Sequence, residues 1–212
     1  MLRAIRQDLQ AIFDRDPAAT SSLEVILTYS GFHALLAYRI SHRLQMIGIP
    51  ILPRAVSQLA RLLTGIEIHP SAKIGTGFFI DHGMGVVIGE TAEIGDYVTL
   101  FQGVTLGGTG KERGKRHPTL GNHVVVGAGA KILGGIGIGD NVKIGANSVV
   151  LKNVPANSTV IGVPARIIKT QGERLPDATM DQVDLPDPIS DRIVALEQEL
   201  IELRKKLENQ DS

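Results

Sequence analysis

Cysteine and tryptophan are both absent from this chain of 212 residues, and the other aromatic residues are scarce. The lack of cysteine excludes disulfides, thiolate zinc sites and a cysteine nucleophile, and it fits the reducing environment of the cytoplasm. Phe, Trp and Tyr together make up only 4% of the residues, although most globular cores depend on them. The composition therefore predicts a core of stacked aliphatic side chains, as found in repeat folds.

An excess of charge of one sign is missing too, as are long apolar runs. Acidic and basic residues balance at 22 each, so no overall field attracts the chain to nucleic acid or to an anionic membrane. The charged N-terminus leads into no apolar run, which predicts that there is no signal peptide. The most apolar early stretch contains Glu24 and His33 and is too short to span a bilayer. We therefore expect a cytoplasmic protein that binds neither nucleic acid nor membranes.

Residues 1–65 have the pattern of a helical domain. Asp16-Pro17 has the form of an N-cap followed by proline at the first helical position. Apolar residues recur at helical spacing from Gly31 to Ile47. A further helix is predicted from Pro53 to Thr64, ended by Gly65. The apolar face of this last helix consists of Val56, Leu59, Leu62 and Leu63.

From Ile68 onward the apolar period changes to six, and glycine, of which the chain has 24, becomes frequent. The anchors of this period are Ile68, Ile74, Ile80, Ile88, Ile94, Leu100, Leu106, Leu120, Val126, Ile132, Ile138, Ile144 and Val150. A six-residue period is typical of a parallel β-helix, in which each anchor stacks on its equivalent one coil away. Many anchors precede a glycine, which suits either a positive φ or a close backbone approach. The alternative is chance alternation in a β-sandwich, which so long a register disfavours.

The six-residue register breaks twice, and each break contains a histidine. The first break surrounds Asp81-His82-Gly83, and the second is a loop at residues 107–118. Insertions leave the core of a solenoid as loops, where binding sites often form. A histidine can take a proton from an alcohol near neutral pH. Glu67 lies fifteen residues before His82, slightly less than a coil of three hexapeptides, so it could sit nearby and orient the imidazole.

The C-terminal segment differs from the repeats. Residues 169–188 are polar and contain proline, which is typical of a linker. In residues 189–212 the apolar side chains follow a heptad seam formed by Ile189, Ile193, Leu196, Leu200, Leu203 and Leu207. We predict a self-associating coiled-coil helix there, and the alternative is a single amphipathic helix that lies on the body.

Several motifs, spread over residues 15–168, resemble those of bacterial and plant serine acetyltransferases. They are Gly31-Phe-His-Ala-Leu, Ile80-Asp-His-Gly, Val87-Ile-Gly-Glu-Thr, Val104-Thr-Leu-Gly-Gly-Thr-Gly-Lys, Arg116-His-Pro and Gly162-Val-Pro-Ala-Arg. Hexapeptide repeats alone indicate only the acyltransferase superfamily, whereas this set is much more specific. The resemblance implies an α+β fold in which the helices of residues 1–65 precede a left-handed parallel β-helix at 66–168. That handedness is an exception to the usual right-handed crossover.

The resemblance also implies an activity and the residues that perform it. The family transfers the acetyl group of acetyl-CoA directly to the hydroxyl of L-serine, which gives O-acetyl-L-serine and CoA in the first step of cysteine biosynthesis. His82 matches the general base, and Glu67 matches its carboxylate partner, a position that is often Asp. The residues that match substrate contacts are Asp81, Arg116, His117 and Asp16. The residues that match the CoA channel are Gly108, Ala128, Ala146 and Lys143.

The expected assembly is a homotrimer with active sites between neighbouring subunits, without a metal, and with cysteine as a feedback inhibitor at the serine site. The short helical region argues against the pairing of two trimers. The chain ends Asn209-Gln-Asp-Ser rather than in isoleucine, which argues against docking onto O-acetylserine sulfhydrylase. We hypothesise that the C-terminal helix holds the trimer together.

Three alternatives remain open from the residues themselves. The first is acetyl transfer to another acceptor, such as a sugar, homoserine or an antibiotic, on the same scaffold. Arg116 and Asp81 favour an amino acid as the acceptor, but they do not identify serine by themselves. Trimeric β-helix carbonic anhydrases bind zinc through three histidines, and His82, His117 and His123 offer such a set. The third alternative is a scaffold without enzymatic activity, against which the two ionisable clusters argue.

Overall fold

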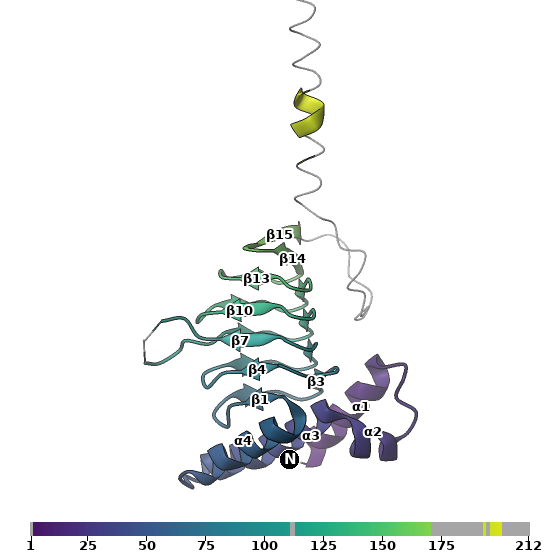
Figure 1. The fold of residues 1–212 in the computed structure, drawn as a ribbon, viewed down its shortest axis with the longest axis vertical. Helices are drawn as coiled ribbons and strands as arrows, with labels where there is room; N and C mark the ends of the chain where they lie inside the picture. The colour runs from purple at the N-terminus through teal and green to yellow at the C-terminus, as the bar shows by residue number, and fades with distance from the viewer. Residues whose placement is uncertain (1, 111–112, 171–192, 194–195, 201–212) are drawn as a thin grey trace, which may run out of the picture. The chain divides into compact units, whose positions relative to one another are not determined.

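The computed structural model describes residues 2–110, 113–170, 193 and 196–200. Four helices precede a stack of short strands (Figure 1). The helices are α1 Leu2–Arg15, α2 Ser22–Thr28, α3 Ser30–Met46 and α4 Leu52–Thr64. The chain divides into two compact units, residues 1–182 and 183–212. In the second unit the described residues, Ile193 and 196–200, are helical.

The helix bounds agree with the sequence prediction except at Asp16. Helices α3 and α4 begin and end within about two residues of the predicted positions, and Gly65 closes α4 with a φ of 71°. Asp16 does not cap a helix, because the N-cap of α2 is Ser21, which accepts a hydrogen bond from the Glu24 N–H at 3.2 Å. The Asp16 carboxylate instead accepts from the Ala18 N–H at 2.8 Å and forms a turn after α1.

The strands form a left-handed parallel β-helix with three faces, as predicted. The first face contains β1 Glu67–Ile68, β4 Val87–Ile88, β7 Thr105–Gly107, β10 Lys131–Leu133 and β13 Val149–Val150. The second face contains β2 Lys73–Ile74, β5 Glu93–Ile94, β8 Thr119–Leu120 and β11 Gly137–Ile138. The third face contains β3 Phe79–Ile80, β6 Thr99–Leu100, β9 Val125–Val126, β12 Lys143–Ile144, β14 Ser158–Gly162 and β15 Ala165–Thr170.

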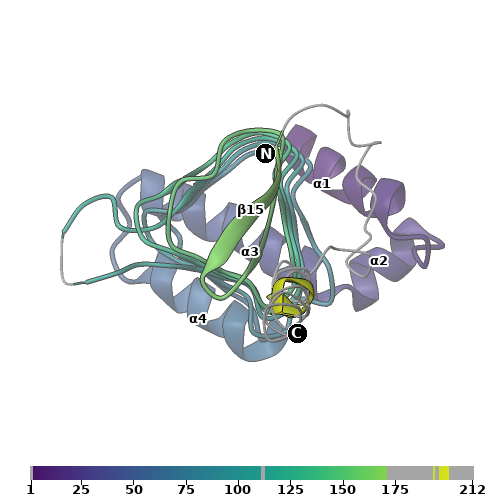
Figure 2. The same ribbon diagram turned by 90° about the horizontal axis from the view of Figure 1, so that it is seen from above.

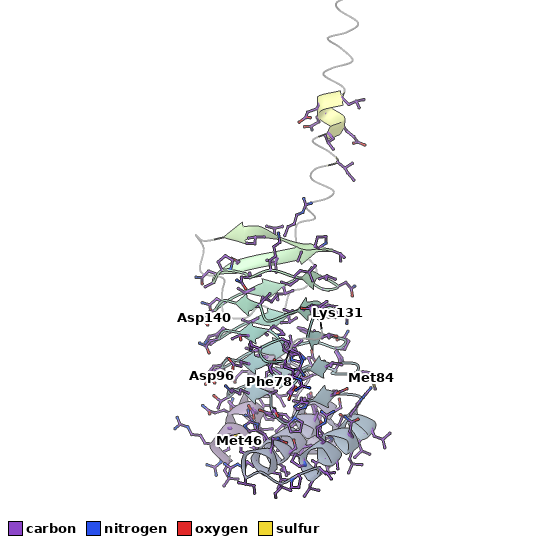
Figure 3. All side chains as sticks on the ribbon, turned by 90° about the vertical axis from the view of Figure 1, so that its left-hand side faces the viewer. Met46, Phe78, Met84, Asp96, Lys131 and Asp140 are labelled. Carbon is purple, nitrogen blue, oxygen red and sulfur yellow. The ribbon has the colours of Figure 1, made fainter. Side chains whose placement is uncertain are left out.

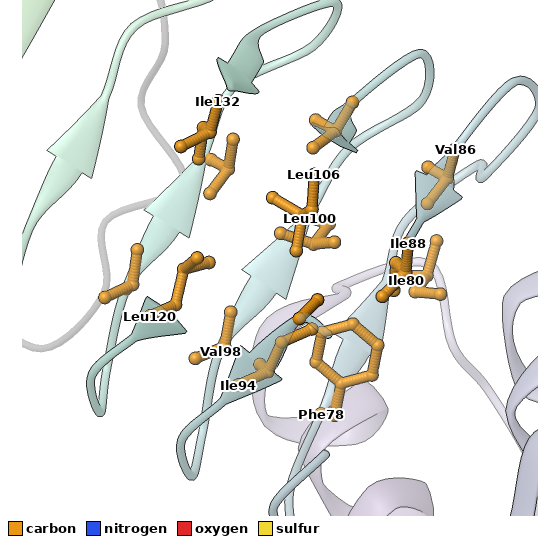
Figure 4. Close-up of a cluster of buried hydrophobic side chains, with 14 of the residues drawn as sticks. Phe78, Ile80, Val86, Ile88, Ile94, Val98, Leu100, Leu106, Leu120 and Ile132 are labelled. Atoms are coloured by element: carbon orange, nitrogen blue, oxygen red, sulfur yellow. The ribbon is translucent and has the colours of Figure 1, made fainter. Parts of the chain in front are cut away.

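The thirteen predicted anchors are all buried and form the core of the β-helix (Figure 4). Along each face an anchor pairs with the anchor of the neighbouring coil, so that Ile88 pairs with Leu106 and Leu106 with Ile132. The glycines after the anchors serve a close approach rather than a positive φ. A Cβ on Gly95, for example, would lie 2.7 Å from the Gly121 backbone in the next coil. The six-residue period therefore has two physical causes, which are the burial of the anchors and the close stacking of neighbouring coils at the glycines.

Three corners of the β-helix connect its faces, and the candidate site residues are located below by the corner at which they lie. The His82 corner joins the third face to the first at His82, Gln102, Ala128 and Ala146. The His117 corner joins the first face to the second at Gly89–Thr91 and at the loop whose described residues, 108–110 and 113–118, project from the stack (Figure 2). The Tyr97 corner joins the second face to the third at Gly77, Tyr97, His123, Asn141 and Asn157, all of which have positive φ. Figure 3 shows Asp96 and Asp140 of the Tyr97 corner on one side of the stack and Met84 and Lys131 on the other.

A buried ion pair fixes the helices to the first coil. Asp8 of α1 is almost fully buried and pairs with Arg39 of α3 at 3.1 Å. The Asp8 carboxylate also accepts from the Phe78 N–H at 3.1 Å, and Arg39 donates to the Ile74 carbonyl at 2.8 Å. Burial raises the pKa of Asp8, and Arg39 opposes that effect. The helices and the coils thus share one polar network, which sets where the helices stand relative to the turns.

The far end of the β-helix is closed by an antiparallel pair, β14 and β15. Strand β15 runs to Thr170, slightly beyond the predicted end of the catalytic domain at 168. The predicted linker of 169–188 lies mostly outside the described residues, as does most of the predicted C-terminal helix of 189–212. The coiled coil therefore stays a prediction.

The predicted apolar face of α4 is mostly open to solvent in the single chain, with only Val56 half-buried. Leu59, Leu62 and Leu63 are exposed, as is Met84 beside Gly65. The α4 side that packs inward carries Ser57, whose hydroxyl donates to the Ile68 carbonyl at 2.6 Å. An exposed row of large apolar side chains is a common mark of a protein contact surface. Among the described residues, no helix is both long and apolar enough to cross a membrane.

Candidate active site

The first break in the register places Asp81 and His82 at the His82 corner, directly after β3. The His82 side chain is 75% exposed, and its Nε2 lies 4.0 Å from Asp81 Oδ1. His82 has a φ of 58°, which is uncommon for a side chain of this size. The Ser30 hydroxyl at the start of α3 donates to the His82 carbonyl at 3.1 Å. The imidazole is thus open to a substrate, while its backbone is held by the helical region.

A second carboxylate reaches the same corner from the helical region. Tyr29, between α2 and α3, donates its hydroxyl to Asp16 Oδ2 at 2.8 Å. Burial, then the hydrogen bond to Asp16 and the charge of Asp16, raise the pKa of Tyr29 to about 12, with smaller contributions from the charges of Glu24 and Asp81. The Asp16 carboxylate also acts electrostatically on Asp81, and two carboxylates that influence each other in this way suit an ammonium group.

The pKa of Asp81 depends on its burial and on the neighbouring charges. Burial raises the pKa of the Asp81 carboxyl above its usual range, His82 opposes that effect, and the Asp16 carboxylate raises it further. A cation placed between the two carboxylates would relieve their repulsion. The pair therefore favours a positively charged group of the substrate.

Glu67 occupies a different position from the one that its spacing suggested. The first coil takes twenty residues, because Glu67 pairs with Val87 in the sheet, and so Glu67 lies under Val87 rather than under His82. Its carboxylate forms an ion pair with Arg61 of α4 at 3.0 Å. Within the described residues, the carboxylate that comes within 4.0 Å of His82 is that of Asp81. The role of Glu67 as partner of His82 remains a prediction.

The second break in the register forms a cluster of basic and polar groups at the His117 corner. The Arg116 guanidinium pairs with the Glu90 carboxylate, which follows β4. This hydrogen bond holds the pKa of Glu90 below its usual value. The guanidinium is about one-third exposed, so it can still offer donors to a carboxylate from solvent.

His117 is held far more tightly than His82. Its residue is only 9% exposed, and its Nδ1 lies 3.2 Å from the Thr91 N–H and 2.9 Å from the Thr91 hydroxyl. The same hydroxyl accepts from the N–H groups of Arg116 and His117, each at 3.1 Å. Burial lowers the pKa of His117, and the Arg116 charge lowers it further. A neutral, fixed imidazole results.

The ring of His117 needs glycine beneath it. A Cβ built on Gly89 would overlap with the ring, and one built on Gly108 would lie 3.3 Å from Nε2. Burial lowers the pKa of His69, which follows β1, and the charge of His117 is one of the smaller effects that lower it further. The predicted loop residue Gly108 thus belongs to the His117 corner.

The residues predicted to line a CoA channel divide in the same way. Ala128 and Ala146 follow β9 and β12, so they stack above His82 at its corner, whereas Lys143 lies in β12 itself. Gly108 follows β7 at the His117 corner. One chain therefore places two of the four predicted CoA residues at the His82 corner and one at the His117 corner, with the first face between the two corners.

The three histidines of the zinc alternative lie at three different corners. His82, His117 and His123 follow strands of the third, first and second faces, respectively, and His123 stacks on Tyr97 instead. Over the described parts of the chain, no group of three His, Cys, Asp or Glu side chains could hold a metal ion. One chain does not bring this histidine set together.

The sequence analysis gave no role to Glu90, Thr91, Tyr29 or Ser30, although Glu90 and Thr91 belong to one of the motifs of the resemblance. For the first two a signal existed. The eight inserted residues lengthen the coil from 18 to 26 residues at β5 and β8, where Ile94 pairs with Leu120. Counting back 26 residues from His117 and Arg116 gives Thr91 and Glu90, their contacts one coil below. No comparable count leads to Tyr29 or Ser30, because the helices have no fixed register with the coils.

Comparison with known proteins gives the same family from two directions. A family model described as "Serine acetyltransferase, N-terminal" matches residues 1–37, and one described as "Bacterial transferase hexapeptide (six repeats)" matches residues 117–152. The chain is 55% identical over 207 residues to a serine acetyltransferase of Bacillus subtilis, which covers 98% of this chain and 95% of that protein.

Solved structures agree with the sequence matches. The serine acetyltransferase of Neisseria gonorrhoeae in complex with serine is 45% identical, with a TM-score of 0.77 over 79% of this chain and 69% of that one. A serine acetyltransferase in complex with cysteine is 44% identical, with a TM-score of 0.83 over 87% of this chain and 72% of that one.

Proposed function

The chain belongs to the serine acetyltransferase family, and we propose that it transfers the acetyl group of acetyl-CoA to the hydroxyl of L-serine. The observation that supports L-serine as the substrate is the pair of charged clusters at the His82 and His117 corners. Two carboxylates and a histidine suit an ammonium group and a hydroxyl, and an arginine with a second histidine suits a carboxylate. Together these charges complement a zwitterionic amino acid that bears an alcohol. The products are O-acetyl-L-serine, an intermediate for cysteine biosynthesis, and CoA.

His82 is the general base in this mechanism. It takes the hydroxyl proton of serine while the serine oxygen attacks the thioester carbonyl, which gives a tetrahedral intermediate. The carbon–sulfur bond then breaks, and the CoA sulfur leaves with the proton that the imidazolium returns. No acyl-enzyme is needed. By resemblance, we assign Glu67 to orient His82. For this role Glu67 must give up its partly exposed ion pair with Arg61, a contact worth about 1 kcal/mol or less.

Asp81 and Asp16 bind the ammonium group of serine, while Arg116 and His117 bind its carboxylate. Gly108, Ala128, Ala146 and Lys143 contact CoA, since small residues let the pantetheine arm approach the backbone. The acetyl group must be presented where both serine-binding clusters can reach it.

A homotrimer satisfies that requirement. The two half-sites lie at two corners of one prism, and a three-fold rotation sets the His82 corner of one subunit beside the His117 corner of its neighbour. The exposed leucines of α4 support a contact between copies. Each trimer then carries three sites, each completed by two subunits.

The test is an assay of CoA release with acetyl-CoA and L-serine, beside D-serine, homoserine and a sugar acceptor, for the wild type and His82→Ala. We expect turnover with L-serine and a loss on the order of 10²–10⁴ in the variant. Turnover with another acceptor alone would contradict the substrate, and an unaffected variant would contradict the base. Cysteine should compete with serine, since it carries the same ammonium and carboxylate groups, and mixed or absent inhibition would contradict a shared site.

A further inference from the structure

The hydrogen bonds around Thr91 determine where the proton of His117 resides. A backbone N–H can only donate, so the Thr91 N–H requires His117 Nδ1 to be an acceptor. The Thr91 hydroxyl receives the N–H groups of Arg116 and His117, which occupies its lone pairs and leaves its own hydrogen for Nδ1. Nδ1 therefore carries no hydrogen, and the neutral ring carries it on Nε2.

The position of Nε2 makes this assignment matter. Nε2 lies beside Gly108 and over Gly89, where a Cβ on either glycine would crowd it. Two glycines thus leave space next to the one ring atom that can donate. The backbone of Arg116 is held at the same point, because the Thr91 hydroxyl also accepts a hydrogen bond from the Arg116 N–H.

We propose that Thr91 is a positioning residue that fixes His117 as a neutral Nε2–H donor, so that His117 recognises an anionic oxygen of the amino acid and never acts as a base. One hydroxyl orients both groups that meet the substrate carboxylate, the imidazole and the guanidinium. The recognition step rests on the proposed function, whereas the tautomer does not depend on it. The division of labour leaves proton transfer to His82.

The direct test is a ¹⁵N-edited imidazole spectrum of the full-length, ligand-free protein, with His117 assigned from its loss in His117→Gln. We expect the Nε2–H tautomer at neutral pH and protonation only at a lower pH than in a short peptide. An Nδ1–H tautomer or a charged ring at neutral pH would overturn the proposal. This result stands whether or not the protein acetylates serine, so it separates this inference from the proposed function.

The second test compares Thr91→Val with Thr91→Ser. Valine keeps the shape but removes the hydroxyl, and we expect KM for serine to rise about tenfold, the loss of one hydrogen bond to a charged group, with kcat changed little. Serine at this position should restore KM to within about twofold of the wild type. Equal KM values for the two variants would overturn the role of the hydroxyl.

Thr76→Val is the matched control. The Thr76 hydroxyl also bridges two coils, donating to Asp96 at 3.1 Å, but it does so at the Tyr97 corner, where no candidate site residue lies. Its KM for serine should equal that of the wild type. A similar rise in KM in this variant would show that the loss of any hydroxyl between coils weakens binding, and would contradict a specific role for Thr91.

Discussion

The two corners that hold the candidate site are built in opposite ways. At the His82 corner the imidazole is exposed and carries one distant carboxylate, whereas at the His117 corner the imidazole is buried and fixed on Nδ1. A general base must accept and return a proton within each turnover, which suits an open ring. A group that only recognises substrate gains from being held in one orientation, because less entropy is lost on binding. The proposed mechanism thus gives the same residue type two different tasks, each suited to its surroundings.

Alanine at each histidine should separate these tasks most strongly. We expect His82→Ala to lower kcat on the order of 10²–10⁴, because the base is lost. His117→Ala should mainly raise KM for serine, because a contact present in both ground state and transition state is removed. Steady-state kinetics with both substrates varied measures the split. A pure KM effect at His82 or a pure kcat effect at His117 would reverse the assignment.

Gly89→Ala should disturb the fixed corner alone. The added Cβ would overlap with the His117 ring, so we expect KM for serine to rise about 10- to 100-fold through the loss of one or two hydrogen bonds to the substrate. The control is Gly137→Ala in β11, where a Cβ would meet only Asn153 at 3.9 Å. If both variants bound serine like the wild type, the ring would not need its present position.

The open corner should govern the acid side of the pH profile. In the proposed mechanism the charged form of Asp81 binds the ammonium group, so binding should be complete above the pKa of Asp81 and should be lost as the pH falls through it. Because the pKa of Asp81 is raised, mainly by burial and further by Asp16, KM for serine should begin to rise at a higher pH than for an ordinary aspartate. Asp16→Asn removes the nearby charge and should move this limb to lower pH. Asp140→Asn, at the Tyr97 corner, should leave the acid limb of the pH profile where it is. An acid limb that is unchanged in Asp16→Asn would contradict the electrostatic coupling between Asp16 and Asp81.

Tyr29→Phe should have the smallest effect of this series. The hydroxyl of Tyr29 orients Asp16 at 2.8 Å without reaching the His117 corner. We expect KM for serine to rise by a few-fold, roughly the value of one partly exposed hydrogen bond, with an unaltered His117 spectrum. A change in the His117 resonances would show that the two corners are coupled within one chain.

Sequence periodicity was a strong guide to the β-helix and a weak one to its surroundings. The anchors from Ile68 to Val150 are all buried because a repeat allows each side chain one place. The leucine face of α4 was found by its period, yet it is exposed, since period reveals that a face is apolar and not which chain covers it. Asp16 was identified as a site residue by resemblance and misplaced as a helix cap, because an Asp-Pro pair suits turns as well.

The site was predictable where it follows the coil register. His82, Arg116 and His117 stand at the two insertions, and their neighbours Glu90 and Thr91 follow from the 26-residue coil. Glu67 shows the limit of such counting, because it is a strand residue of the first face that pairs with Val87, twenty residues later, whereas His82 lies at a corner. A register does not identify the partner subunit; the expectation of sites between subunits came from the family resemblance, and the structure adds that the candidate residues lie at two different corners of one chain.

The central claim is that one site needs the His82 corner of one subunit and the His117 corner of its neighbour. The most direct test co-expresses His82→Ala and Arg116→Ala chains with two different affinity tags and isolates trimers that carry both tags. Each variant alone should be nearly inactive. In any mixed trimer one site of three combines an intact His82 with an intact Arg116, so about a third of wild-type activity should return. Mixed trimers no more active than the single variants would show that each site is made within one chain, and would contradict the account.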